Sequence, residues 1–96
     1  MLSLRPTCEN CNKSLPPNSK EAMICSYECT FCSDCVKEVL HNVCPNCGGG
    51  FENRPIRPSA GLKKHPASQE VVFKPVHQAT FQPLMGKNQN IRPEER

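Results

Sequence analysis

The chain of 96 residues has room for one small domain, and its apolar content is low. Leu, Ile, Val and Phe together account for 19 residues, Trp is absent and Tyr occurs once, which excludes a large aromatic core. No apolar run approaches the roughly 18 residues that span a bilayer, and the first residues lack the apolar stretch of an export signal. We therefore predict a cytoplasmic protein that does not associate with a membrane.

The two halves of the chain differ in composition. Residues 1–50 contain every cysteine and carry a formal charge of −1, whereas residues 51–96 carry +4 and six of the ten prolines. This asymmetry predicts a cysteine-rich module over residues 1–50, followed by a basic, proline-rich tail over residues 51–96 that is mostly disordered.

The cysteine-rich half has too few apolar residues to offset the conformational entropy lost on folding, so it needs cross-links. Its eight cysteines form four close pairs: Cys8 and Cys11, Cys25 and Cys29, Cys32 and Cys35, Cys44 and Cys47. Close pairs suit tetrahedral coordination by thiolates, whereas disulfides gain most by closing long loops. In a reducing compartment, clustered cysteines are typically metal ligands. The spacing therefore predicts two metal sites with four cysteines each.

Zinc is the metal that the pattern favours, with two ions per chain. An iron–sulfur cluster is the alternative, because Cys25, Cys29 and Cys32 match the three-cysteine spacing of radical enzymes. Those enzymes need a large barrel domain, which 96 residues cannot supply. A ferredoxin run would usually have proline after its last cysteine, where this chain has Val36.

Residues 35–43 are predicted to form a short helix. Four apolar residues recur there with helical spacing: Val36, Val39, Leu40 and Val43. Ser33 or Asp34 can cap the N-terminus of this helix, which places Cys35 in the first turn. His41 falls on the polar face and is expected to be a surface residue rather than a ligand.

A β-hairpin is expected just before this helix. Residues 22–25 and 30–32 are its strands, and Ser26, Tyr27 and Glu28 form the turn. A knuckle followed by a hairpin and a helix is the order of elements in a treble-clef zinc finger. The predicted fold is therefore a small, metal-stabilised α+β module.

Four pairs can share two metal ions in three ways, which are sequential, nested and interleaved. Cys29 and Cys32 are three residues apart in a predicted strand, so their side chains point to opposite faces and favour different ions. This condition excludes the nested arrangement. The sequential arrangement would leave the predicted helix over residues 35–43 beside one ion only, so we favour the interleaved arrangement. It predicts one site from Cys8, Cys11, Cys32 and Cys35, and a second from Cys25, Cys29, Cys44 and Cys47.

The eight-ligand pattern resembles a RING finger. Residues 29–36 are similar to that family's H-x-F-C-x-x-C segment, with Cys29 in place of His, and residues 44–47 match its C-P-x-C motif. This resemblance implies a cross-brace of two zinc ions. Ubiquitin-ligase activity is not expected, because Glu9 and Asn10 lie where ligases usually have an apolar residue, and Gly48 lies where they often have a basic one.

Residues 4–49 more closely resemble a family of short bacterial proteins known as domain of unknown function number 1272. The shared segments read L-R-P-x-C-E-x-C, I-C-S-x-E-C-T-F-C-x-D-C-V and C-P-N-C-G-G. The resemblance implies a small bacterial zinc-binding protein and names no activity.

The tail offers three weaker patterns. Residues 55–58 read P-x-x-P and are interpreted as a stiff linker, residues 70–76 resemble an edge strand, and residues 81–86 are an apolar patch. Residues 87–96 are expected to be disordered.

The chain shows no constellation of catalytic residues, so we predict no enzymatic activity. The favoured function is a zinc-binding interaction module whose partner is another protein. A nucleic-acid-binding zinc protein is the alternative, because the tail is basic. The module disfavours phosphate, since it formally carries −5 once eight thiolates hold two divalent ions, and no aromatic residues alternate with the basic residues of the tail.

Overall fold

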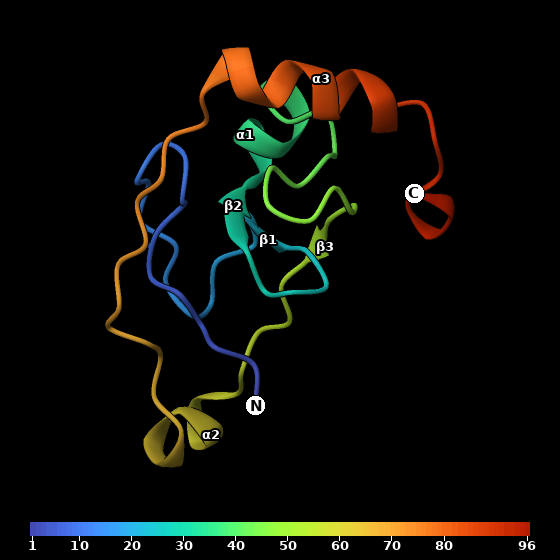
Figure 1. Ribbon diagram of the computed structural model, residues 1–96. Helices are drawn as coiled ribbons and strands as arrows, with labels where there is room; N and C mark the ends of the chain where they lie inside the picture. The colour runs from blue at the N-terminus through green and yellow to red at the C-terminus, as the bar shows by residue number, and fades with distance from the viewer.

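The computed structural model describes all residues 1–96 as a small three-stranded sheet with short helices around it (Figure 1). The elements in chain order are β1 (Ala22–Ile24), β2 (Thr30–Cys32), α1 (Ser33–Glu38), β3 (Glu52–Asn53), α2 (Ser59–Lys64), α3 (Gln78–Asn88) and a 3-10 turn, η1 (Pro93–Glu95). The predicted small α+β class, with one hairpin and one helix in the cysteine-rich half, is confirmed.

Strands β1 and β2 form the predicted antiparallel hairpin. Met23 lies opposite Phe31 at its centre. The turn closes through a hydrogen bond from the N–H of Glu28 to the oxygen of Cys25, and Glu28 adopts a positive φ of 66°. All three residues of β2 are buried, and α1 packs against both β1 and β2.

Helix α1 is shorter than the predicted helix over residues 35–43. It ends at Glu38, and His41 and Asn42 have positive φ values of 49° and 59°, which no helix tolerates. Leu40 and Val43 are nonetheless fully buried, as their apolar pattern required. The helix N-cap is Cys32, without a side-chain hydrogen bond, and not Ser33 or Asp34 as predicted.

Strand β3 was not predicted. It pairs antiparallel with β1, which gives the sheet the order β2-β1-β3. Glu52 and Asn53 are both exposed and polar, so the sequence shows no alternation of apolar and polar residues here. Only the backbone pairing reveals this strand.

The prediction that the tail over residues 51–96 is mostly disordered is wrong. Helices α2 and α3 both lie in it, and residues 87–96, which were expected to be disordered, contain the end of α3 and the turn η1. The edge strand expected over residues 70–76 is also absent, because that segment lies outside the sheet. Of the apolar patch at residues 81–86, Phe81 and Met85 lie on the buried face of α3, whereas Gln82, Pro83 and Gly86 are exposed.

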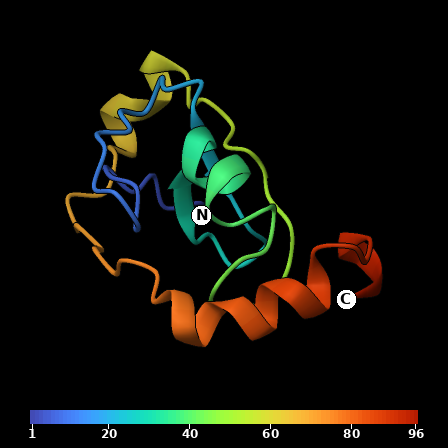
Figure 2. The same ribbon diagram turned by 90° about the horizontal axis from the view of Figure 1, so that it is seen from above.

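The hydrophobic core joins the tail to the cysteine-rich half. Phe31 of β2 meets Phe51 edge to face, with ring centroids 5.4 Å apart. Phe81 and Met85 of α3 are buried in the same cluster. Helix α3 thus lies along one end of the module, while α2 lies at the other end (Figures 1 and 2). The chain therefore orders its tail by burying apolar side chains that the cysteine-rich half cannot cover alone.

The longest helix, α3, has 11 residues. No helix in this fold has the length and hydropathy that crossing a membrane requires.

Candidate metal centre

The first cysteine pair lies in a tight knuckle at residues 8–13. The N–H of Cys8 bonds to the oxygen of Lys13 at 2.9 Å, and the N–H of Asn12 bonds back to the oxygen of Cys8 at 3.0 Å. Asn12 takes a positive φ of 63°, a conformation that Asn accepts more readily than most residues. The turn therefore places Cys8 and Cys11 on the same side of the loop.

The last cysteine pair lies in a second knuckle with the same hydrogen bonds. The N–H of Cys44 bonds to the oxygen of Gly49 at 2.8 Å, and the N–H of Gly48 bonds back to the oxygen of Cys44 at 2.8 Å. Gly48 has a φ of 79°, at the position equivalent to Asn12 in the first knuckle. Two distant parts of the sequence thus repeat one local structure.

The first knuckle meets the end of the hairpin and the start of α1. The Sγ atoms of Cys8, Cys11, Cys32 and Cys35 all lie within 4.8 Å of one another. The Sγ atoms of Cys11 and Cys32 are 3.7 Å apart. A tetrahedral zinc ion with Zn–S bonds of about 2.3 Å would separate its sulfurs by about 3.8 Å, so the donor set suits such an ion.

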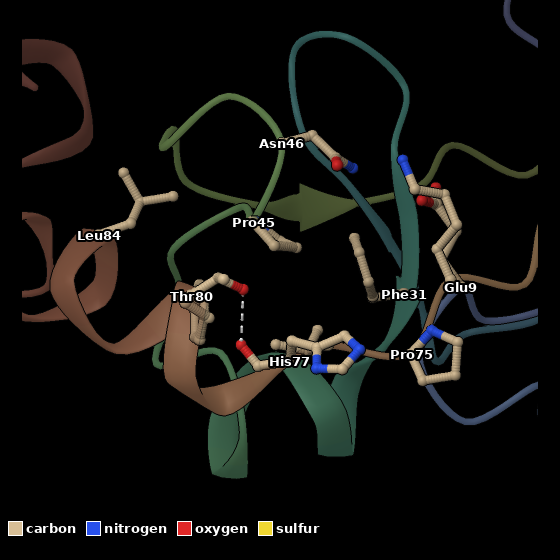
Figure 3. A pocket seen from close by; sticks show the side chains of 11 residues that line it. Glu9, Phe31, Pro45, Asn46, Pro75, His77, Thr80 and Leu84 are labelled. Carbon is tan, nitrogen blue, oxygen red and sulfur yellow. Dashed lines mark hydrogen bonds between the residues drawn. The ribbon is translucent and has the colours of Figure 1, made fainter.

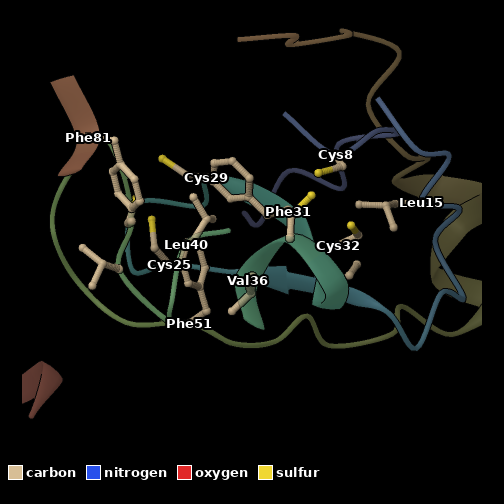
Figure 4. Close-up of a cluster of buried hydrophobic side chains, with 14 of the residues drawn as sticks. Cys8, Leu15, Cys25, Cys29, Phe31, Cys32, Val36, Leu40, Phe51 and Phe81 are labelled. Atoms are coloured by element: carbon tan, nitrogen blue, oxygen red, sulfur yellow. The ribbon is translucent and has the colours of Figure 1, made fainter. Parts of the chain in front are cut away.

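The second knuckle approaches the turn of the hairpin. The Sγ atoms of Cys25, Cys44 and Cys47 lie within 4.8 Å of one another. Cys29 lies outside this tight group, but its Sγ accepts a hydrogen bond from Asn46 of the same knuckle at 3.3 Å. The two groups follow the interleaved arrangement, and all eight cysteines are free thiols. In Figure 4 the sulfurs of Cys25 and Cys29 lie at one end of the core, and those of Cys8 and Cys32 at the other.

Each knuckle also supplies an asparagine that donates to sulfur. Asn10 Nδ2 lies 3.3 Å from the Sγ of Cys35, just as Asn46 Nδ2 lies 3.3 Å from the Sγ of Cys29. Each amide therefore reaches the second cysteine of the pair that its knuckle joins. A hydrogen bond to sulfur stabilises the charged thiolate.

Sequence reasoning missed these two donors. A signal was present, because both knuckles read Cys-x-Asn-Cys, with the asparagine directly before the second cysteine. The sequence reasoning considered Asn10 only as a residue that departs from the RING-ligase pattern. Its amide instead belongs to the surroundings of the first thiol group.

Burial shapes the acidity of the thiols in the metal-free chain. Burial raises the pKa of Cys35 and of Cys44 far above the ordinary range, and raises the pKa of Cys29 and Cys32 as well. At the exposed Cys11, burial acts in the same direction, but hydrogen bonds from the Lys13 backbone and the neighbouring thiols outweigh it and lower its pKa. A metal ion must therefore displace protons from the buried thiols of both groups.

Glu9 has a structural position that the sequence did not reveal. Its carboxylate is buried, and Oε2 accepts hydrogen bonds from the Thr30 N–H and from Arg5, both at 2.8 Å. It lines a cavity of about 260 Å³ where the tail crosses the module (Figure 3). Glu9 thus ties the first knuckle to β2.

His41, the histidine nearest in sequence to the last cysteine pair, is not one of the potential metal ligands. His41 is exposed in the loop after α1, and it belongs to neither cluster of potential ligands. The structure therefore gathers cysteines alone at the two sites.

The fold and the two thiol groups define a small cysteine-rich α+β protein whose sulfur clusters could hold metal ions. The chain belongs to the family described as protein of unknown function (DUF1272), whose model matches residues 1–57. It is similar to an uncharacterized protein of Rhizobium meliloti (strain 1021), with 57% identity over 75 residues, which are 78% of this chain and 89% of that protein. No solved structure matches the chain.

Proposed function

We propose that this protein is a structural module held together by two zinc ions in a treble-clef-like cross-brace. The convergence of Cys8, Cys11, Cys32 and Cys35 within 4.8 Å is the observation that carries this proposal. The second ion would be held by the remaining four: Cys25, Cys29, Cys44 and Cys47. Four-thiolate sets without an open position are typical of structural zinc. Bound zinc would supply folding free energy on the order of 10–16 kcal/mol per site.

Elemental analysis of protein purified without oxygen tests the metal. Two zinc ions per chain and no visible absorption are expected. One metal per chain, or an iron chromophore near about 400 nm, would contradict the proposal. A chelator should then abolish the amide-exchange protection of β1, β2 and α1, because the apolar content of this half is low.

The function that we propose for the module is to bind another protein, without catalysis. The alternative partner is a nucleic acid, for which the basic tail is the motive. The four arginines of the tail are engaged within the chain, which supports the protein partner: Arg54, Arg57 and Arg96 donate to backbone oxygens, and Arg92 pairs with Glu95. Fewer guanidinium donors are therefore free to bind phosphates than the sequence suggests.

Retention on a nucleic-acid column separates the two partners. A protein-binding module should elute at low salt, at the position of a neutral control. Retention that falls steeply as salt is raised would favour the nucleic acid, since phosphate contacts release counterions.

Ubiquitin-ligase activity is not part of the proposal. The buried carboxylate of Glu9 and the amide of Asn10 are engaged inside the protein, and the N–H of Val76 bonds to Asn10 Oδ1 at 2.9 Å. The tail thus contacts the first knuckle at Glu9 and Asn10. Mixed with activating and conjugating enzymes, the chain should not accelerate ubiquitin discharge. Clear stimulation that is lost in Asn10→Ala would overturn this point.

The compartment and the source are also part of the proposal. We place the protein in the bacterial cytoplasm, where a reducing environment keeps clustered thiols available for metal. The 57% sequence identity to a protein of Rhizobium meliloti (strain 1021) supports the bacterial source. Fractionation of the native host, with antibodies against the chain, tests the compartment.

A further inference from the structure

Residues 66–77 run along the outside of the module from α2 to α3 (Figures 1 and 2). Two backbone hydrogen bonds attach this segment, from the N–H of Ser68 to the oxygen of Leu4 at 3.0 Å and from the N–H of Lys74 to the oxygen of Glu9 at 2.8 Å. Between these anchors, Val71 and Phe73 are 57% and 53% exposed. Two large apolar side chains are thus held in water on an ordered segment.

The backbone at these two residues is unpaired. In an extended chain, the N–H and C=O groups of successive residues point to opposite sides. Because the N–H of Lys74 points to the module, the polar groups of Val71 and Phe73 point away from it. Neither residue donates or accepts a hydrogen bond within the chain. Residues 70–74 therefore present an unpaired backbone edge, although they form no strand within the chain.

We infer that this edge pairs with the same segment of a second copy of the chain. The pairing is antiparallel and centred on Val72, so that Val71 lies opposite Phe73 of the second copy and Glu70 lies opposite Lys74. The Val71 and Phe73 positions exchange the backbone hydrogen bonds, since their polar groups point outward. The side chains of Val71 and Phe73 then share one face, and the charged pairs lie on the other face beside Val72.

Charge selects this partner and this direction. Glu70 and Lys74 are exposed and form no ion pair within the chain. The segment Glu-Val-Val-Phe-Lys is complementary to itself when reversed, whereas a parallel copy would oppose Glu70 with Glu70 and Lys74 with Lys74. Pro75 has no N–H and ends the pairing. The two-fold contact closes on itself, so a dimer forms rather than a filament.

The inference rests on the proposed function only in taking the partner to be a protein. Sedimentation of the full, metal-loaded chain over a concentration series measures the dimer, and elemental analysis of the same samples measures the metal separately. A contact of five residues per copy is small, so we expect a dissociation constant on the order of 100 µM. The amides of Val71 and Phe73 should gain exchange protection as concentration rises.

Charge swaps provide the decisive variants. Glu70→Lys and Lys74→Glu should each weaken the dimer about tenfold, and the double variant should restore it, because the opposed charges are again complementary. Phe73→Ser should weaken it, whereas Ile56→Ser, which removes an exposed apolar residue elsewhere, should not. A chain that stays monomeric at about 1 mM, or a dimer that ignores these charges, overturns the inference. Loss of the metal alone would instead count against the proposed function.

Discussion

The side-chain amide of Asn10 connects the tail to the Sγ of Cys35. Its Nδ2 donates to that sulfur at 3.3 Å, while its Oδ1 accepts from the Val76 N–H at 2.9 Å. The second bond fixes which end of the amide faces the sulfur, since a flipped amide would oppose oxygen to sulfur and N–H to N–H. The same side chain therefore binds the tail at Val76 and donates a hydrogen bond to the sulfur of Cys35.

Asn10→Asp should weaken metal binding at the first site by roughly 10- to 100-fold, because a carboxylate repels the thiolate that the amide supports. Competition with a chromophoric chelator measures the affinity. Asn46→Asp should do the same at the second site, through Cys29. Asn18→Asp, which adds the same charge at an exposed position, is the matched control. Equal affinities in all three variants would show that the amides have no part in metal binding.

Metal retention should depend steeply on pH. Burial raises the pKa of Cys29, Cys32, Cys35 and Cys44 above their usual value, so the metal-free folded chain holds these protons firmly. The metal needs thiolates, hence its apparent affinity rises with pH and falls in acid, by up to about four decades per pH unit for four thiols.

A pH series of metal release, read with a chromophoric dye, checks this trend. Circular dichroism should show unfolding in step with release. A protein that keeps both metals at about pH 3 would contradict the expectation of thiolate ligation.

The cysteine spacing predicted how the pairs group. Cys32 at the end of β2 joins the first thiol group, whereas Cys29, one residue before β2, contacts Asn46 of the second knuckle, as alternation along an extended segment predicts. The same local logic predicted the hairpin and the burial of Leu40 and Val43. The predicted helix was too long at its C-terminal end. The positive φ values at His41 and Asn42 depend on tertiary hydrogen bonds, such as that from the Phe51 N–H to Asn42 Oδ1, which the local pattern does not show.

The order of the tail could not be predicted from its composition. Helix α3 contains Pro83 and has no strong apolar face in its sequence, so only contact with the core explains why it is ordered. The sequence also did not reveal that the arginines of the tail bind within the chain. From composition alone they indicate a basic surface, yet Arg54 is buried and donates to three backbone oxygens.

Arg54→Ala should destabilise the metal-loaded protein by about 2–4 kcal/mol. The guanidinium donates to the oxygens of Arg5, Leu15 and Pro16 at 2.8–3.1 Å, and its loss leaves these acceptors without partners. Arg54→Lys should recover part of the loss, because an ammonium lacks the planar fork. Urea unfolding at fixed metal concentration gives the values. Arg92→Ala, which breaks an exposed ion pair with Glu95, should change stability by less than about 1 kcal/mol.

Phe81→Ala should release α3 from the module. Phe81 is 3% exposed and packs in the core, so truncation should cost about 3–5 kcal/mol or detach the helix altogether. Amide exchange can tell these results apart, because a detached tail loses the protection of α3 while β1 and β2 keep theirs. Phe73→Ala, at an exposed position, should leave the exchange of α3 unchanged at concentrations where the chain is monomeric. Fast exchange of α3 in the unaltered protein would contradict the packing of Phe81 and Met85. A detached α3 would also weaken the hydrogen bond from the Val76 N–H to Asn10, because α3 begins only two residues after Val76.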